Sequence, residues 1–231
     1  MLTLAPPPKI ITFDCYGTLV QWHHAVQQAA AALLERHQGA TPPHAQALAL
    51  ADRLRAITVE RQQQSPFCTY DNVLCTGLEQ ALEEAGHTAT AQDMNTLLAI
   101  LGRIPPHPEV PDVLACLRER YQVAIISNTT DQLIAGTVSA LGTPIDFVIT
   151  AEQAQAYKPD HRLFLHAHEV MGVTKEQTVH VAMGQFSDLK VCKELGIRCV
   201  WINRKGEPLN ADWQPDAVLK DLSGLPALLT P

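Results

Sequence analysis

Three features are absent from the sequence: a paired-cysteine motif, a long apolar run and an excess of basic residues. The six cysteines include no CxxC pair, and their spacings match neither common zinc ligation nor a redox motif, so we expect reduced structural thiols. No apolar stretch approaches the roughly 20 residues of a membrane span, and the N-terminal MLTLAPPPK lacks the pattern of a signal peptide. These absences favour a cytoplasmic protein with no membrane partner.

The charge balance disfavours a second class of partner. The 231 residues include 17 Lys and Arg against 24 Asp and Glu, which gives a formal net charge of −7. Proteins that bind nucleic acids usually present a basic face to the phosphate backbone, so we expect no nucleic-acid partner. A small anionic substrate is not excluded, because it needs only a local positive site.

Short β-rich runs alternate with helical segments over most of the chain. The expected strands are residues 9–13, 123–127, 146–150, 178–182 and 199–203. The expected helices between the later strands are Asp131–Leu141, Asp160–Met171 and Ser187–Leu195. This alternation predicts an α/β fold, a Rossmann-like parallel sheet with helices on both faces.

Residues 22–104 break the alternation. They are rich in Ala, Leu, Glu and Gln at helical spacing, are interrupted at Pro42–Pro43 and Gly86, and end at the proline-rich segment 104–111. The sequence therefore predicts an all-helical insert at residues 22–104, with the sheet domain formed by residues 1–21 and 105–231.

Polar residues follow four of the expected strands. Because ligands of open parallel sheets bind at the carboxyl ends of the strands, these are the segments in which we expect a site. They are Asp14–Leu19, Ser127–Thr130, Tyr157–Asp160 and Met183–Asp188.

The residue types in these segments fit nucleophilic catalysis. Asp14 follows a strand directly, and a carboxylate fixed there can attack an electrophilic carbon or phosphorus. Thr18 is placed to hydrogen-bond to that carboxylate, and Lys158 nearby would favour its ionised form. Ser127 would add a hydroxyl at an anion site. Taken singly, each has an ordinary reading as a turn residue, a helix cap or a solvated lysine.

The four segments together resemble a known family. FDCYGTL, ISN, YKPD and the segment around Asp188 are similar to the four sequence motifs of the haloacid dehalogenase superfamily. The resemblance covers essentially the whole chain and implies that the helical insert is a cap domain. It also implies a hydrolase and a homodimer.

Two positions point to one branch of that family. Phosphatases of the superfamily carry Asp-x-Asp in the first motif, whereas Tyr16 here resembles the DxYGTL form of L-2-haloacid dehalogenases. Halide leaves without protonation, so a second acid is dispensable. Met183 stands where the phosphatases place a magnesium ligand, and a thioether binds a hard ion poorly. We therefore expect no metal and no cofactor.

The resemblance assigns roles to individual residues. Asp14 would displace halide from a small 2-substituted carboxylate and form an ester, Thr18 would orient Asp14, and Asp188 with Lys158 would activate the water that hydrolyses the ester. A catalytic role for Asp188 competes with that of a helix N-terminal charge. Contacts to the substrate are expected from Cys15, Tyr16, Ser127, Asn128, Gln185 and Arg53, with Arg55 as the alternative to Arg53.

Departures from the family pattern keep other readings open. Met183 and Gln185 replace the Ser and Asn of such dehalogenases, Phe164 replaces a Tyr, and no intact WRxKQ segment is present. A magnesium-dependent phosphatase that tolerates Tyr16 and a catalytically silent relative are the two alternatives. Two further residues, His180 and Trp201, are predicted as core, while Trp22, His23 and His24 are expected at a hinge or in the pocket.

Overall fold

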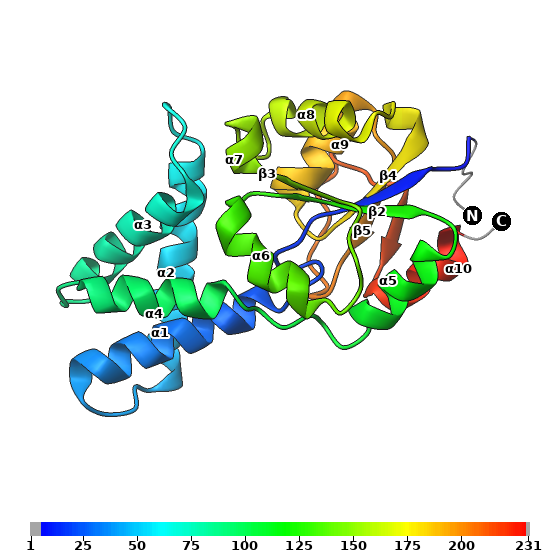
Figure 1. Cartoon of the computed structure of the whole chain (residues 1–231). Coiled ribbons are helices and arrows are strands. Elements are labelled where there is room, and N and C mark those ends of the chain that lie inside the picture. The colour runs from blue at the N-terminus through cyan, green and yellow to red at the C-terminus, as the bar shows by residue number, and fades with distance from the viewer. Residues whose placement is uncertain (1–5, 230–231) are drawn as a thin grey trace.

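The computed structural model describes residues 6–229, and its central feature is a six-stranded parallel sheet (Figure 1). The strand order is β3-β2-β1-β4-β5-β6. The strands are β1 (Ile10–Phe13), β2 (Gln122–Ser127), β3 (Phe147–Thr150), β4 (Thr178–Ala182), β5 (Cys199–Ile202) and β6 (Ala217–Leu219). The predicted α/β fold and its five strands are confirmed. β6 was missed because it has only three residues, one of them exposed.

The central strand of the sheet is buried from solvent on both faces. In β1, Ile10, Ile11 and Phe13 are completely buried, as expected for a strand covered on both faces. β1 lies between β2 and β4, with Phe13 level with Ile125 and Val181. This register brings the ends of β1, β2 and β4 to one edge of the sheet, where Ser127 ends β2 and where Asp14 and Met183 follow β1 and β4.

Helices cover both faces of the sheet (Figure 1). One face carries α8 (His161–Met171) and α9 (Lys190–Leu195), and the other carries α5 (Val110–Arg118), α6 (Asp131–Ala140) and α10 (Leu225–Leu229), while α7 (Ala151–Ala154) follows β3. The first two predicted helices are confirmed to within a residue at each end. The third differs, because a π-helical turn (Gln185–Leu189) precedes α9.

The segment between β1 and α5 forms four helices that lie together beside the sheet (Figure 1). They are α1 (Trp22–Gln38), α2 (His44–Gln62), α3 (Tyr70–Glu84) and α4 (Ala91–Leu101). Their apolar faces, including Leu33, Leu54 and Leu78, are buried. Close approach of α2 and α3 depends on Gly77, where a Cβ would lie 3.2 Å from Thr58 Cγ2.

The six cysteines are free thiols, and no helix within residues 6–229 is long and apolar enough to cross a membrane.

Candidate active site

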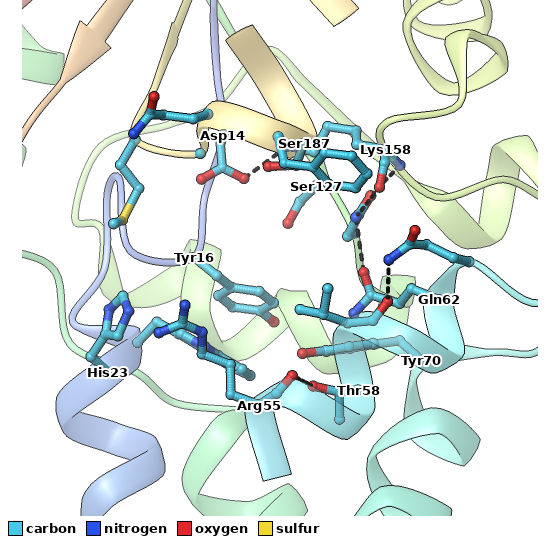
Figure 2. Close-up of a pocket in the computed structure, with 18 of the residues that line it drawn as sticks. Asp14, Tyr16, His23, Arg55, Thr58, Gln62, Tyr70, Ser127, Lys158 and Ser187 are labelled. Carbon is cyan, nitrogen blue, oxygen red and sulfur yellow. Dashed lines mark hydrogen bonds and ion pairs between the residues drawn. The ribbon is translucent and has the colours of Figure 1, made fainter. Parts of the chain in front are cut away.

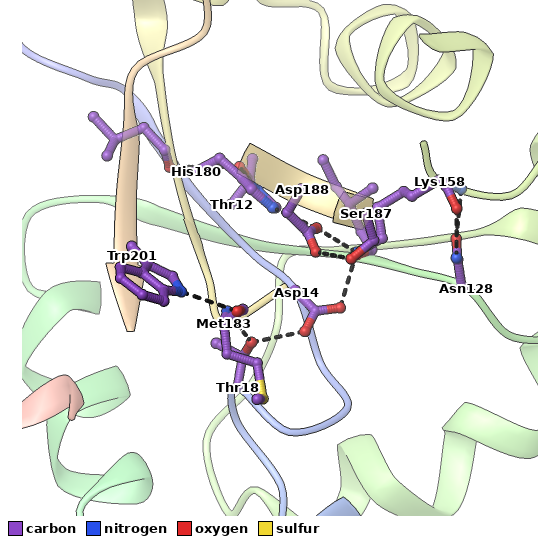
Figure 3. Close-up of polar contacts among 12 residues, drawn as sticks. Thr12, Asp14, Thr18, Asn128, Lys158, His180, Met183, Ser187, Asp188 and Trp201 are labelled. Carbon is purple, nitrogen blue, oxygen red and sulfur yellow. Dashed lines mark hydrogen bonds and ion pairs between the residues drawn. The ribbon is translucent and has the colours of Figure 1, made fainter. Parts of the chain in front are cut away.

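Lys158 is the centre of a buried polar cluster at the carboxyl edge of the sheet (Figure 3). Its Nζ donates to Asp14 Oδ1 at 2.8 Å, to Asp188 Oδ1 at 2.7 Å and to the carbonyl of Ile126 at 2.9 Å. An ammonium has three N–H donors, so all of them are used. The Asn128 side chain fixes the backbone of Lys158, accepting from its N–H at 2.7 Å and donating to its carbonyl at 3.0 Å.

Asp14 is held on both carboxylate oxygens. Oδ1 accepts from Lys158, and Oδ2 accepts from Thr18 Oγ1 at 2.7 Å. Thr18 Oγ1 in turn accepts from the backbone N–H of Met183 at 2.9 Å. The loop reaches this geometry through Gly17, whose φ of +91° and close approach to Met183 Sδ both exclude a side chain.

Asp188 lies deeper than Asp14. Its Oδ1 contacts Lys158 and, at 3.1 Å, His180 Nε2, while its Oδ2 accepts from Ser187 Oγ at 2.5 Å. The other ring nitrogen of His180 lies 2.9 Å from Thr12 Oγ1. Because the carboxylate only accepts, Nε2 of His180 carries the proton and the imidazole helps to orient Asp188.

The two carboxylates that share the Lys158 ammonium have pKa values shifted in opposite directions. Burial raises the pKa of Asp14 above its usual value, and Lys158 offsets this only in part. Burial would also raise the pKa of Asp188, but Lys158 and His180 outweigh it and hold that pKa below the usual range. Burial opposes the charge on Lys158, yet the two carboxylates raise its pKa. Asp14 is thus the more easily protonated carboxylate.

A cavity of about 350 Å³ opens beside Asp14, between the sheet and the helices (Figure 2). Its aromatic wall contains Tyr16, Trp22 and Tyr70, with ring centroids of Tyr16 and Trp22 4.8 Å apart. Arg55 of α2 lies across the cavity from Asp14. The cavity combines a fixed carboxylate, an apolar wall and a cation, which suits a small anionic substrate with an apolar part.

Ser127 offers a free donor to this cavity. Its side chain is buried at the end of β2 and lines the cavity, yet its Oγ has no hydrogen-bond partner among the described residues. A buried hydroxyl without a partner is costly in a folded protein, so such a group suggests a ligand atom beside it.

The structure brings together the residues that the sequence placed at the centre of the site. Asp14, Thr18, Lys158 and Asp188 are directly linked, and Ser127 opens onto the same cavity. Tyr16, Trp22 and His23 line the cavity too, whereas His24 is not among its lining residues.

Arg53 is wrong as a substrate contact. It forms an exposed ion pair with Glu84 and lines a different hollow, because residues 53 and 55 point to different sides of α2. The alternative, Arg55, faces the cavity (Figure 2).

Of three more predicted contacts, Cys15 needs correction, while Gln185 and Asn128 line the cavity. The Cys15 side chain is completely buried and does not line the cavity. Gln185 does line it, but its amide donates to the Pro208 carbonyl and accepts from the Asn210 N–H. The Asn128 amide is likewise engaged, with Lys158 and Gln62. The last two side chains therefore hold loops in place at the cavity wall.

Sequence reasoning missed two partners of Asp188. Ser187 is its neighbour in the chain, and only the π-helical turn turns both side chains toward each other. His180 was predicted as a satisfied core residue; it is fully buried, but one of its two partners is Asp188. The sequence signal that could have indicated this contact is the position of His180 in β4, eight residues before Asp188 in the turn that follows the strand.

The donor set does not fit a divalent cation. Both oxygens of Asp14 and both of Asp188 already face Lys158, hydroxyl groups or an imidazole. Tyr16 and Met183 add no hard ligand. Within residues 6–229, no cluster of three or more His, Cys, Asp or Glu is arranged to hold a metal.

Comparison with known proteins agrees with this fold. A family model for haloacid dehalogenase-like hydrolases matches residues 8–202. The (S)-2-haloacid dehalogenase of Pseudomonas sp. strain YL is 28% identical over 203 residues, covering 86% of this chain and 84% of that protein. The (S)-2-haloacid dehalogenase 4A of Burkholderia cepacia is 28% identical over 214 residues, covering 90% and 88%. A crystal structure of a dehalogenase with an intermediate complex has a TM-score of 0.85 at 24% identity, covering 97% and 98%.

The fold is of the α/β class, a parallel sheet with a carboxylate at the tip of its first strand. The chain belongs to the haloacid dehalogenase-like hydrolase family.

Proposed function

We propose that the protein hydrolyses the carbon–halogen bond of a small 2-haloacid through a covalent ester on Asp14, without a metal. The observation that carries this proposal is the Asp14 carboxylate, held by Lys158 and Thr18 and facing a cavity in which Tyr16 replaces a second acid. Its relatives named (S)-2-haloacid dehalogenases make the S enantiomer the first substrate to test.

The substrate carboxylate is proposed to bind at Ser127. The unpartnered hydroxyl of Ser127 lies at the sheet side of the cavity, at the end of β2. A hydrogen bond to an ionised carboxylate is stronger than one between neutral groups. This contact would place the 2-carbon next to Asp14 rather than against the aromatic wall.

The first chemical step is a displacement. An oxygen of Asp14 bonds to the 2-carbon as the carbon–halogen bond breaks, and the halide leaves with its electron pair. Arg55 lies across the cavity from Asp14, where departing halide would meet a cation (Figure 2). Its guanidinium has no ion-pair partner among residues 6–229, so it is free to receive an anion.

The second step is hydrolysis of the ester. Water attacks the carboxyl carbon of Asp14, Lys158 stabilises the negative charge that develops there, and Asp188 accepts a proton. The 2-hydroxy acid leaves and Asp14 returns as a carboxylate.

The helices α1–α4 are proposed to act as a cap over residues 1–21 and 105–231. Tyr157 donates to the Cys68 carbonyl at 2.6 Å, Asn128 donates to Gln62 at 3.0 Å, and Thr130 donates to Asp71 at 3.2 Å. These bonds tie the end of α2 and the start of α3 to the sheet domain, at one side of the cavity. The homodimer expected from the resemblance stays a prediction.

Halide release in the presence of EDTA tests the proposal. Wild-type protein is expected to release chloride or bromide from (S)-2-halopropionate, and Asp14→Asn is expected to release it at least about 10⁴-fold more slowly. Asp112→Asn, on the exposed start of α5, is a matched control that should keep full activity. Magnesium-dependent cleavage of phosphomonoesters without halide release would contradict the proposal. So would the absence of turnover on all small haloacids, which would favour a silent relative.

A further inference from the structure

The proposed proton acceptor does not reach the cavity by itself. Asp188 has no exposed surface and is absent from the residues that line the cavity. Ser187, the preceding residue, does line it, and its Oγ donates to Asp188 Oδ2 at 2.5 Å. Ser187 thus lies between the buried carboxylate and the space in which a hydrolytic water would stand (Figures 2 and 3).

The other polar groups near Asp188 are occupied. Lys158 uses all three donors on Asp14, Asp188 and the Ile126 carbonyl. Gln185 faces the cavity, but its amide is tied to the backbone at Pro208 and Asn210. The thioether of Met183 accepts hydrogen bonds only weakly. In this part of the cavity wall, the Ser187 hydroxyl donates to Asp188 and keeps a lone pair that can accept a hydrogen bond from water.

The local backbone is shaped around this pair. Gly184 precedes the π-helical turn, and its carbonyl accepts from the N–H groups of Asp188 at 3.2 Å and Leu189 at 3.1 Å. A Cβ at position 184 would collide with both Ser187 Oγ and Asp188 Oδ2. Since Gly184 has φ of −75°, which any residue adopts, it is this side-chain pair that excludes a larger residue.

We propose that Ser187 is a catalytic residue in ester hydrolysis, which holds the attacking water and passes its proton to Asp188. This inference rests on the proposed function. As the water oxygen bonds to the Asp14 carboxyl carbon, one water proton moves to Ser187 Oγ and the Ser187 proton moves to Asp188 Oδ2. The tetrahedral carbon then expels the alkoxide of the 2-hydroxy acid, which takes up one proton, and the other proton leaves to solvent. Asp14 and Asp188 return as carboxylates.

The shared ammonium supports the direction of this transfer. Lys158 contacts both Asp14 and Asp188. Negative charge that develops on Asp14 during the attack attracts the Lys158 ammonium. The ammonium then stabilises the Asp188 carboxylate less, and Asp188 becomes a stronger proton acceptor. Formation of the ester needs no proton transfer, so Ser187 should matter for the second step alone.

Rapid-quench single-turnover kinetics with (S)-2-chloropropionate separate the two steps. Chloride release reports ester formation, and the mass of the intact protein reports the ester. In Ser187→Ala, we expect chloride release at the wild-type rate within about twofold, followed by ester hydrolysis slowed about 100-fold, the usual scale for losing a proton-transfer group. Ser187→Thr keeps the hydroxyl and should restore hydrolysis, and Ser139→Ala, on the exposed face of α6, is the matched control.

Three results would overturn the inference. The first is an ester that does not accumulate in Ser187→Ala, and the second is an equal loss of both steps. The third is a Ser187→Thr protein as slow as Ser187→Ala. Normal chloride release by the alanine variant also proves that it is folded. Failure of the wild-type protein itself to release halide would instead refute the proposed function, and this inference with it.

Discussion

The two walls of the cavity are built differently. On the sheet side, the buried side chains of Lys158, Asp14 and Asp188 have three, two and three partners. On the helix side, the Arg55 guanidinium has no hydrogen-bond or ion-pair partner among the described residues and stands in an exposed position. Fixed groups suit bond making, because they need no rearrangement, while free groups suit ligand capture. We therefore expect the sheet side to carry the chemistry and the helix side to select the substrate.

Replacing Asp14 should have the largest effect. Asp14→Asn removes the nucleophile, and we expect kcat to fall by about 10⁴-fold or more, the scale seen when a nucleophile is lost. The same change removes a buried negative charge, so the melting temperature should not fall. Halide release and thermal unfolding, measured on the same sample, check both parts. Residual activity above one hundredth of wild type would remove Asp14 from its proposed role.

Lys158→Met should damage both activity and folding. The variant leaves two buried carboxylates beside each other, and loss of one partner of such a group costs about 3–5 kcal/mol. We expect activity about 10³-fold below wild type and a lower urea midpoint.

The pH dependence of that loss has a defined sign. The lowered pKa of Asp188 adds stability above its unfolded pKa, which is lost as the pH falls. In Lys158→Met this contribution is gone and the carboxylates repel, so the stability gap to wild type should be widest at neutral pH. It should narrow as acid protonates the carboxylates of the variant and, below about pH 3.8, as wild type loses the Asp188 contribution. A gap independent of pH would contradict the charge argument.

Arg55→Ala tests whether the helix side of the cavity acts in ligand binding rather than in the chemical steps. We expect kcat/KM to fall about 10- to 100-fold, mainly through KM and halide affinity, because a single charge-assisted contact is worth about 1.5–3 kcal/mol. Arg53→Ala, two residues away and paired with Glu84 on the surface, should change activity less than twofold. Equal effects of the two substitutions would argue against a selective helix wall.

The pH profile should report Asp14. Its carboxyl must be ionised to attack, and burial raises its pKa above 3.8. Activity should therefore fall about tenfold per pH unit below that raised pKa and persist into the alkaline range, where the raised pKa of Lys158 keeps the ammonium charged. An acid limb at or below pH 3.8 in kcat/KM would contradict this assignment.

The sequence predicted the sheet side of the site well. Asp14 directly follows a β-rich run and Ser127 ends another, and the parallel sheet brings strand ends together. Lys158 lies beyond β3, in the loop after α7. The helix side was less predictable. Arg53 and Arg55 lie two residues apart on one helix, and only the packing of α2 decides which of them faces the cavity.

Local geometry explains the remaining misses. Gln185 is by residue type a suitable hydrogen-bond donor to a substrate. Its amide instead bonds to the backbone of the 203–216 loop, which has little regular structure. Ser187 faces Asp188 because of a π-helical turn, which hydrophobic periodicity does not reveal. His180 looked like core because it is in a buried strand, and its contact with Asp188 depends on side-chain direction at the strand end.

A single turnover in ¹⁸O-labelled water tests the covalent role of Asp14 most directly. With enzyme in excess over (S)-2-chloropropionate, the account predicts that the label enters the Asp14 side chain, found by mass spectrometry of the peptide that contains it, and that the first hydroxy acid released is unlabelled. Label in the hydroxy acid with none in Asp14 would mean that water attacks the substrate directly, and it would contradict the account.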